Sequence, residues 1–197
     1  GPLAARLRVV PLALTERNIQ EYKDRFSDPT ASDRERFGAL RLLRRNDAMS
    51  DDVVFTALNW MQTTTNANVR GQLVQSLDGA TNAAMKQPLM SLLATESSAR
   101  TRAEIVDTLS GFAESDPAVA NKLWELAQND PDRNVREEAL EELADAGTLS
   151  ENQVAVLQER AIRGDMPVED RLMAFEVLRE ALASTVGSRV AGLVTMC

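Results

Sequence analysis

Histidine is absent from the 197-residue sequence, and cysteine occurs once, as Cys197. Because histidine is the usual general base and the commonest metal ligand, its absence excludes a Ser-His-Asp triad, a Cys-His pair and His-ligated zinc or iron sites. A lone cysteine can form neither an intramolecular disulfide nor a thiolate zinc site. The sequence also lacks a phosphate-binding loop and a dinucleotide fingerprint. We therefore expect a protein that is not an enzyme, with no catalytic residues, no metal and no cofactor.

Aromatic residues are scarce, at 4% of the chain, although 44% of all residues are apolar. This composition is globular and favours helices over β-sandwiches. No stretch approaches the roughly 18 apolar residues of a membrane span. The apolar segment Leu3–Leu14 is short and contains two arginines and a proline, and Gly1-Pro2 resembles the scar of an expression-tag cleavage site. The single cysteine slightly favours the cytoplasm, and the periplasm stays open if the native chain has an upstream signal or anchor.

Basic residues are outnumbered, with 22 Lys and Arg against 30 Asp and Glu, so the net charge is −8. The imbalance is uneven along the chain. Residues 1–46 carry ten basic and six acidic residues, a net charge of +4, whereas the rest carries twelve and twenty-four, a net charge of −12. Phosphate binding needs a basic footprint, so free nucleic acid is not expected as a partner.

What the sequence does contain is an internal repeat marked by five arginines, the register arginines, which recur 34, 32, 34 and 35 residues apart. They are Arg36, Arg70, Arg102, Arg136 and Arg171. The residues three, four and seven positions after each one are always apolar: Ala39, Leu40 and Leu43; Leu73, Val74 and Leu77; Ile105, Val106 and Leu109; Ala139, Leu140 and Leu143; Ala174, Phe175 and Leu178. These offsets define one face of a helix. Each register arginine is therefore predicted to lie near the start of an amphipathic helix, the second helix of its repeat.

A first helix is predicted before each second helix, over Thr15–Phe26, Ser50–Gln62, Asn82–Thr95, Asp116–Gln128 and Ser150–Ala161. Ser50 and Ser150 precede acidic residues, which is typical of a helix start, and Pro117 suits the first helical position. Pro88 lies inside the third of these helices, so that helix should kink or start late. Gly147 suits the end of a second helix. No segment alternates with the period of two that a strand requires.

Residues 130–147 resemble a bacterial HEAT repeat. The family pattern is an Asp near the turn, then Val-Arg, a small residue and leucines at helical spacing, and the matching residues are Asp132, Val135, Arg136, Ala139, Leu140 and Leu143. Residues 66–74 match well, with Asn66 in the Asp position, whereas the other three repeats are degenerate. The resemblance covers roughly residues 15–184.

The resemblance implies an all-α fold, a right-handed α-solenoid of about five antiparallel helix pairs with the second helices lining a concave face. It also implies a structural role for the five register arginines and Asp132, with each arginine bonded to an acidic or carbonyl group of a neighbouring repeat. We predict three segments: residues 1–13 as an N-terminal extension or cloning remnant, residues 14–184 as a single HEAT-like domain, and residues 185–197 as a C-terminal tail.

Second-helix positions that packing leaves free are predicted to bind a protein or peptide on the concave face. They form a basic end, an acidic band and an apolar pair: Phe37, Arg41, Arg44 and Arg45; Glu104, Asp107, Glu137, Glu138 and Glu141; Leu172 and Met173. A partner of opposite polarity would suit this gradient. The alternative interpretation of the acidic residues is a solvated helix surface, and that of the apolar residues is a cap over the ends of the array.

Two other classes of function stay open. The array could be a homo-oligomerising or interdomain structural module of a larger protein. HEAT-like enzymes that modify nucleic acid combine a basic concave face with tryptophan and a catalytic aspartate; this chain has Trp60 and Trp124, but its acidic charge argues against that class. A cofactor lyase role, known for some HEAT-like proteins, has no residue signature here. A non-catalytic protein-binding scaffold is the favoured interpretation.

Overall fold

The computed structural model describes residues 16–194, with side chains described through residue 183. Every element within residues 16–194 is helical, and none of the described helices is both long enough and apolar enough to cross a membrane. The predicted N-terminal segment 1–13 and Cys197 lie outside the described residues. The chain divides after Ala57 into two compact units, which are described separately here.

The first unit contains one helix pair and the beginning of a third helix. Helix α1 (Glu16–Ser27) is followed by α2 (Asp33–Arg45), and α3 (Asp51–Thr63) begins inside this unit. Ser32 caps α2 by accepting a hydrogen bond from the backbone N–H of Glu35, whose side chain in turn accepts from the backbone N–H of Ser32. The apolar faces of α1 and α2 meet in a core that contains Phe26, Leu40 and Leu43.

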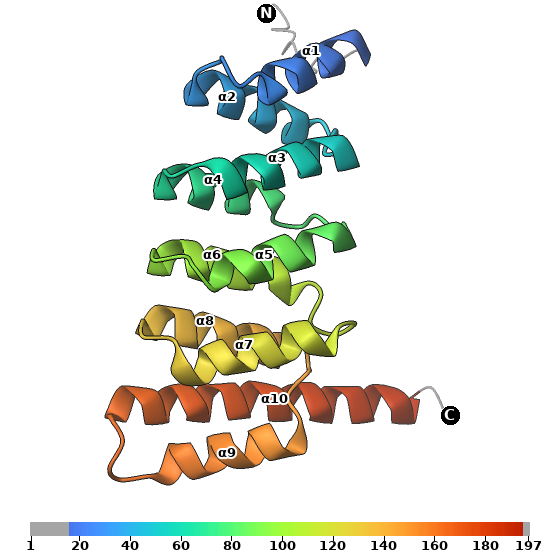
Figure 1. Cartoon of the computed structure of the whole chain (residues 1–197). Helices are drawn as coiled ribbons and strands as arrows, with labels where there is room; N and C mark the ends of the chain where they lie inside the picture. Colours follow the sequence, from blue (N-terminus) through green and yellow to red (C-terminus); the bar gives the residue numbers. More distant parts are fainter. Residues whose placement is uncertain (1–15, 195–197) are drawn as a thin grey trace, which may run out of the picture. The chain divides into compact units, whose positions relative to one another are not determined.

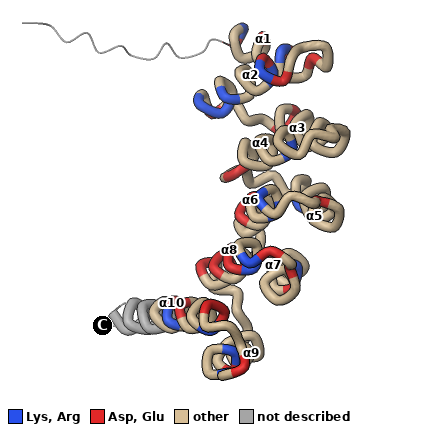
Figure 2. The backbone as a smooth tube through the Cα atoms, turned by 90° about the vertical axis from the view of Figure 1, so that its left-hand side faces the viewer, with Lys and Arg blue, Asp and Glu red and all other residues tan. Residues whose placement is uncertain are grey.

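The second unit continues with the rest of α3 and stacks the remaining helices in pairs. They are α4 (Ala67–Leu77), the short 3-10 helix η1 (Ala83–Met85), α5 (Lys86–Leu93), α6 (Ala99–Ser110), α7 (Pro117–Asn129), α8 (Arg133–Asp145), α9 (Glu151–Ile162) and α10 (Val168–Val194). The second helices α4, α6, α8 and α10 contact one another in sequence. They lie along one side of the unit, and α5, α7 and α9 lie along the other (Figures 1 and 2).

Local sequence explains where these helices begin and end. Side-chain oxygens of Ser98, Asp116 and Ser150 accept backbone N–H bonds at the starts of α6, α7 and α9, and so satisfy donors that have no partner within the helix. Pro88 lies in the first turn of α5, where a missing N–H costs least, because the preceding residues form the 3-10 turn and the α-helix starts late. Gly147 follows α8 with a φ of 63°, a left-handed conformation that glycine adopts without strain.

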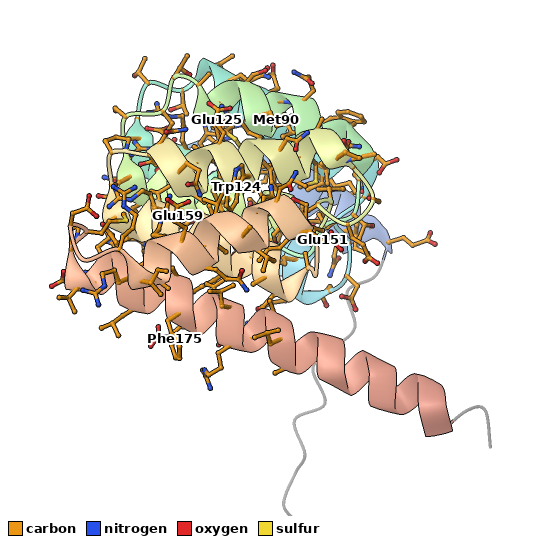
Figure 3. The ribbon with its side chains drawn as sticks, turned by 90° about the horizontal axis from the view of Figure 1, so that it is seen from below. Met90, Trp124, Glu125, Glu151, Glu159 and Phe175 are labelled. Atoms are coloured by element: carbon orange, nitrogen blue, oxygen red, sulfur yellow. The ribbon has the colours of Figure 1, made fainter. Side chains whose placement is uncertain are left out.

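The core follows the register in four repeats and departs from it in the fifth. All predicted core positions of α2, α4, α6 and α8 are buried, but Phe175 on α10 is 61% exposed. The buried face of α10 consists instead of Met173, Ala174, Val177 and Leu178, one position away from the predicted one. Figure 3 shows Phe175 pointing away from the packed helices. Helix α10 packs on α8 and α9, and the face that meets these two helices is the buried one.

Helix α10 is also longer than the sequence predicts. It continues through Val194, so residues 185–194, which were expected to form a C-terminal tail, are helical. The glycine and the polar residues at 187–189 do not interrupt its backbone.

Truncation of Leu140 on α8 should destabilise the protein far more than truncation of Phe175 at the same repeat position on α10. Leu140 is fully buried, so Leu140→Ala loses buried contacts and leaves a cavity, at a cost of about 2–5 kcal/mol. Phe175→Ala removes a largely exposed ring and should cost less than about 1 kcal/mol. Urea denaturation followed by circular dichroism measures both, and similar losses would show that the assigned burial of α10 is wrong.

Candidate functional site

Two register arginines join neighbouring helix pairs through paired hydrogen bonds to buried carboxylates. Arg102 on α6 donates from Nε and Nη2 to the two carboxylate oxygens of Asp130 at 2.8 Å each, and from Nη1 to the backbone carbonyls of Glu96 and Ser97. Arg70 on α4 likewise donates to both carboxylate oxygens of Glu96, at 2.6 and 3.2 Å. Each of these arginines therefore bonds to the turn of the following helix pair.

The other three register arginines also donate hydrogen bonds to backbone carbonyls. Arg136 donates to the carbonyl of Asp130 at 2.9 Å and lies 3.9 Å from a carboxylate oxygen of Asp170. Arg36 donates to the carbonyl of Phe26, and Arg171 to that of Ala161, both in the preceding first helix. The role of Asp132 is different, because its side chain caps α8 by accepting from the N–H of Asn134 at 2.9 Å. We call the set of register arginines with their bonded acids the arginine ladder.

The two buried carboxylates of the arginine ladder, Glu96 and Asp130, are each balanced by an arginine. Burial alone would raise the pKa of Asp130, but hydrogen bonds from Arg102 and from the backbone N–H of Asp132 outweigh it, and the pKa lies below the ordinary value. The pKa of Glu96 is also lowered, against burial, by its hydrogen bonds from Arg70 and the backbone N–H of Ser98. These carboxylates are therefore ionised and already paired, so they are not available to a partner.

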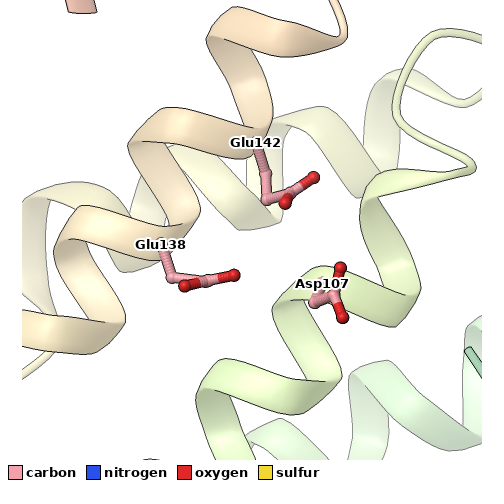
Figure 4. A group of neighbouring side chains, drawn as sticks. All are labelled: Asp107, Glu138 and Glu142. Atoms are coloured by element: carbon pink, nitrogen blue, oxygen red, sulfur yellow. The ribbon is translucent and has the colours of Figure 1, made fainter. Parts of the chain in front are cut away.

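A second group of acids lies on the second helices α6 and α8. Their negative charges are not balanced by arginines as those of Glu96 and Asp130 are. Asp107 on α6 and Glu138 and Glu142 on α8 each place one carboxylate oxygen within 4.8 Å of the others (Figure 4). Glu141 lies one turn from Glu138 on α8. We call these four residues the acidic surface. Among the described side chains, no Lys or Arg forms an ion pair with any of the four.

Burial and mutual repulsion disfavour the charged forms on the acidic surface. The pKa of Glu138 is raised by burial first, and then by Glu142, Asp107 and Glu141. The pKa of Glu142 is raised by burial and by Asp107, against an opposing hydrogen bond with Ser110. Burial is also the main cause of the raised pKa values of Asp107 and Glu141. A cation placed here would relieve the repulsion, so the surface is suited to bind positive charge.

The structure brings together only some of the residues that the sequence predicts for binding. Asp107, Glu138 and Glu141 lie on the acidic surface, and Leu172 is exposed on α10, but Met173 is buried and cannot contact a partner. Met173 is buried because the buried face of α10 is rotated by one position from the predicted one.

The remaining predicted binding residues have local partners or lie elsewhere. Glu137 accepts hydrogen bonds from Arg133, and Glu104 from Arg100. On α2, in the first unit, three predicted arginines are exposed and the predicted phenylalanine is half-buried: Arg41, Arg44, Arg45 and Phe37.

Glu142 was missing from the predicted binding residues. Its spacing of four from Glu138 places both carboxylates on one helix face, and that spacing is the signal that could have identified it.

Carboxylate oxygens are the ligands that hard divalent cations such as Ca²⁺ prefer, so Asp107, Glu138 and Glu142 could hold such an ion. Three side-chain ligands are fewer than the six to eight oxygens that Ca²⁺ takes, and the remainder would have to be water. The same carboxylates could equally accept hydrogen bonds from the side chains of Lys or Arg.

The stacked helix pairs and the arginine ladder define a helical-repeat protein. Residues 56–144 match the family model of HEAT repeats. This matched segment consists of HEAT repeats, as the resemblance of the sequence predicted, and the described part of the chain has the predicted all-α fold. No curated protein matches the chain, and no solved structure does. HEAT repeats generally mediate protein–protein interaction and are typically non-catalytic.

Removing Arg102 from the arginine ladder should strongly destabilise the fold. The side chain of Asp130 is only 3% exposed, so Arg102→Ala leaves a buried charge without its partner, at a cost of about 3–5 kcal/mol. Arg133→Ala is the matched control, because its ion pair with Glu137 is on the surface, where solvent screening leaves it little effect on stability. Urea denaturation of both variants measures the difference, and equal losses would contradict a stabilising ladder.

Neutralising Glu138 should instead stabilise the protein at neutral pH. Because its folded-state pKa is raised, the folded state binds more protons than the unfolded state, and stability falls as pH rises through this range. Glu138→Gln should therefore gain about 0.5 kcal/mol at pH 7, and the gain should shrink towards pH 4. The measurement is urea denaturation at both pH values, with Glu159→Gln on α9 as the control. A gain that is independent of pH, or one shared by the control, would contradict repulsion on the acidic surface.

Proposed function

We propose that this protein is a non-catalytic scaffold that binds a basic segment of a protein partner on the acidic surface. The observation that carries the proposal is the grouping of Asp107, Glu138, Glu141 and Glu142, which have no ion-pair partner among the described side chains and whose pKa values are raised by burial and by repulsion from neighbouring carboxylates. Side chains of Lys or Arg would replace this repulsion by attraction and by charge-assisted hydrogen bonds. The four residues therefore form a surface whose electrostatics improve when a basic partner binds.

The chemistry of the chain supports a protein partner over nucleic acid. The phosphate backbone is itself negatively charged, and the acidic surface would repel it. HEAT repeats generally mediate protein–protein interaction, and a stack of helix pairs offers a continuous side on which an extended or helical segment can lie. The exposed arginines of α2 are proposed as a separate contact, for acidic residues of a partner: Arg41, Arg44 and Arg45.

Replacing two acids of the acidic surface should weaken the binding of a cationic peptide. The probe is a fluorescently labelled oligolysine of about twelve residues, titrated by anisotropy at low salt, where screening is weak. Glu138→Gln with Glu141→Gln should raise Kd by about tenfold, because two carboxylates on the acidic surface lose their charge. Binding by the unaltered protein should also weaken as salt is raised.

The matched control is Glu151→Gln with Glu159→Gln, which makes the same change in net charge on α9, among the first helices (Figure 3). This double variant should keep the Kd of the unaltered protein within about twofold, because its changes lie away from the acidic surface. If the two double variants lose the same affinity, net charge rather than the acidic surface attracts the peptide, and the proposal fails.

A further inference from the structure

Helix α10 carries an exposed apolar stripe that its own fold does not use. Val168, Leu172, Phe175 and Leu182 are each between 55% and 61% exposed, and together they are four of the seven large apolar side chains exposed in the described part of the chain. Their separations are four, three and seven residues, with Arg179 at the intervening position. Alternating steps of four and three place them on one narrow helix face, which is the pattern of a helix that packs along another helix.

The apolar stripe faces outward from a helix whose opposite face is packed. Met173, Ala174, Val177 and Leu178 bury the opposite face of α10, which packs on α8 and α9. Phe175 accordingly points away from the body of the unit in Figure 3. The stripe is already helical before a partner binds, so binding does not include the entropic cost of folding α10.

One edge of the apolar stripe adjoins the acidic surface. Glu176 and Glu180 lie on α10 and are among the charges that raise the pKa of Glu141 on α8, after burial and Glu137. These three carboxylates form an acidic edge between the two helices. A single segment lying along α10 could therefore bury apolar side chains on the stripe and place basic side chains against the acidic edge.

We infer that the segment bound here is an amphipathic helix of a partner protein, with one apolar face and Lys or Arg along one flank. The inference rests on the proposed function and specifies the form of the basic segment. The charge distribution favours this occupant over a second copy of the chain, because antiparallel pairing of two α10 helices would bring the two acidic edges together. Arg179, within the stripe, lies 3.6 Å from a carboxylate oxygen of Glu180 on the same helix, so its charge is already matched there, and Glu141 and Glu176 remain for the basic flank of the partner.

Two labelled peptides of identical Leu and Lys composition test the inference. In one the leucines recur at helical spacing and form an apolar face; in the other the same residues are shuffled so that no face forms. The unaltered protein should bind the amphipathic peptide about tenfold more tightly than the shuffled one. Leu172→Ser with Phe175→Ser should abolish that difference and leave oligolysine binding unchanged. Phe55→Ser, which removes another exposed ring from α3, is the control and should keep the difference.

The outcomes separate this inference from the proposed function. If both peptides bind equally well while oligolysine binding still depends on Glu138 and Glu141, the stripe is not a helix-binding site but the acidic surface still binds basic segments. If oligolysine binding does not depend on those two residues, the proposed function itself fails. Self-association of the unaltered protein in sedimentation velocity, abolished by Leu172→Ser with Phe175→Ser, would show that a second copy occupies the stripe and would overturn the inference.

Discussion

The paired hydrogen bonds between Arg102 and Asp130 are the interaction on which the second unit depends most. Removing these two nearly buried charges from water is unfavourable in free energy. This desolvation penalty is offset only when both guanidinium–carboxylate hydrogen bonds are well formed. That geometry allows one relative position of the α6 start and the turn before α8. The apolar core is less selective, since leucine, valine and alanine pack acceptably in several arrangements. The pair therefore fixes a stacking that apolar burial stabilises.

The way in which the helix pairs stack also determines the electrostatics of the exposed surface of α6 and α8. The arginines at the register positions are directed into the turns between helices, where Glu96 and Asp130 neutralise two of them. Among the described side chains, no Lys or Arg forms an ion pair with the carboxylates of the acidic surface, and the same stacking brings Asp107 towards Glu138 and Glu142. The resulting repulsion costs stability. Such a cost is common at binding surfaces, where a partner removes it.

The fifth repeat combines the two kinds of surface. In α4, α6 and α8 the position four residues after the register arginine is fully buried, but in α10 it is occupied by the exposed Phe175. The rotation of α10 turns an apolar stripe outward while its acidic edge stays close to α8. Apolar area supplies affinity without direction, and charges supply orientation, so the two together define a more specific partner than either does alone.

The sequence by itself determined the helices and their pairing. Caps such as Ser150, the late start imposed by Pro88 and the three-four-seven spacing after each register arginine act within one or two turns of chain, so they can be read without a fold. The HEAT-repeat match of residues 56–144 follows from the same pattern. Only the tertiary structure decided which carboxylate each arginine contacts, that Glu142 converges with Asp107, and that Phe175 rather than Met173 is exposed. These features depend on the rotation of one helix against its neighbours, and helical spacing specifies a face of each helix but not the angle at which that face meets the next helix.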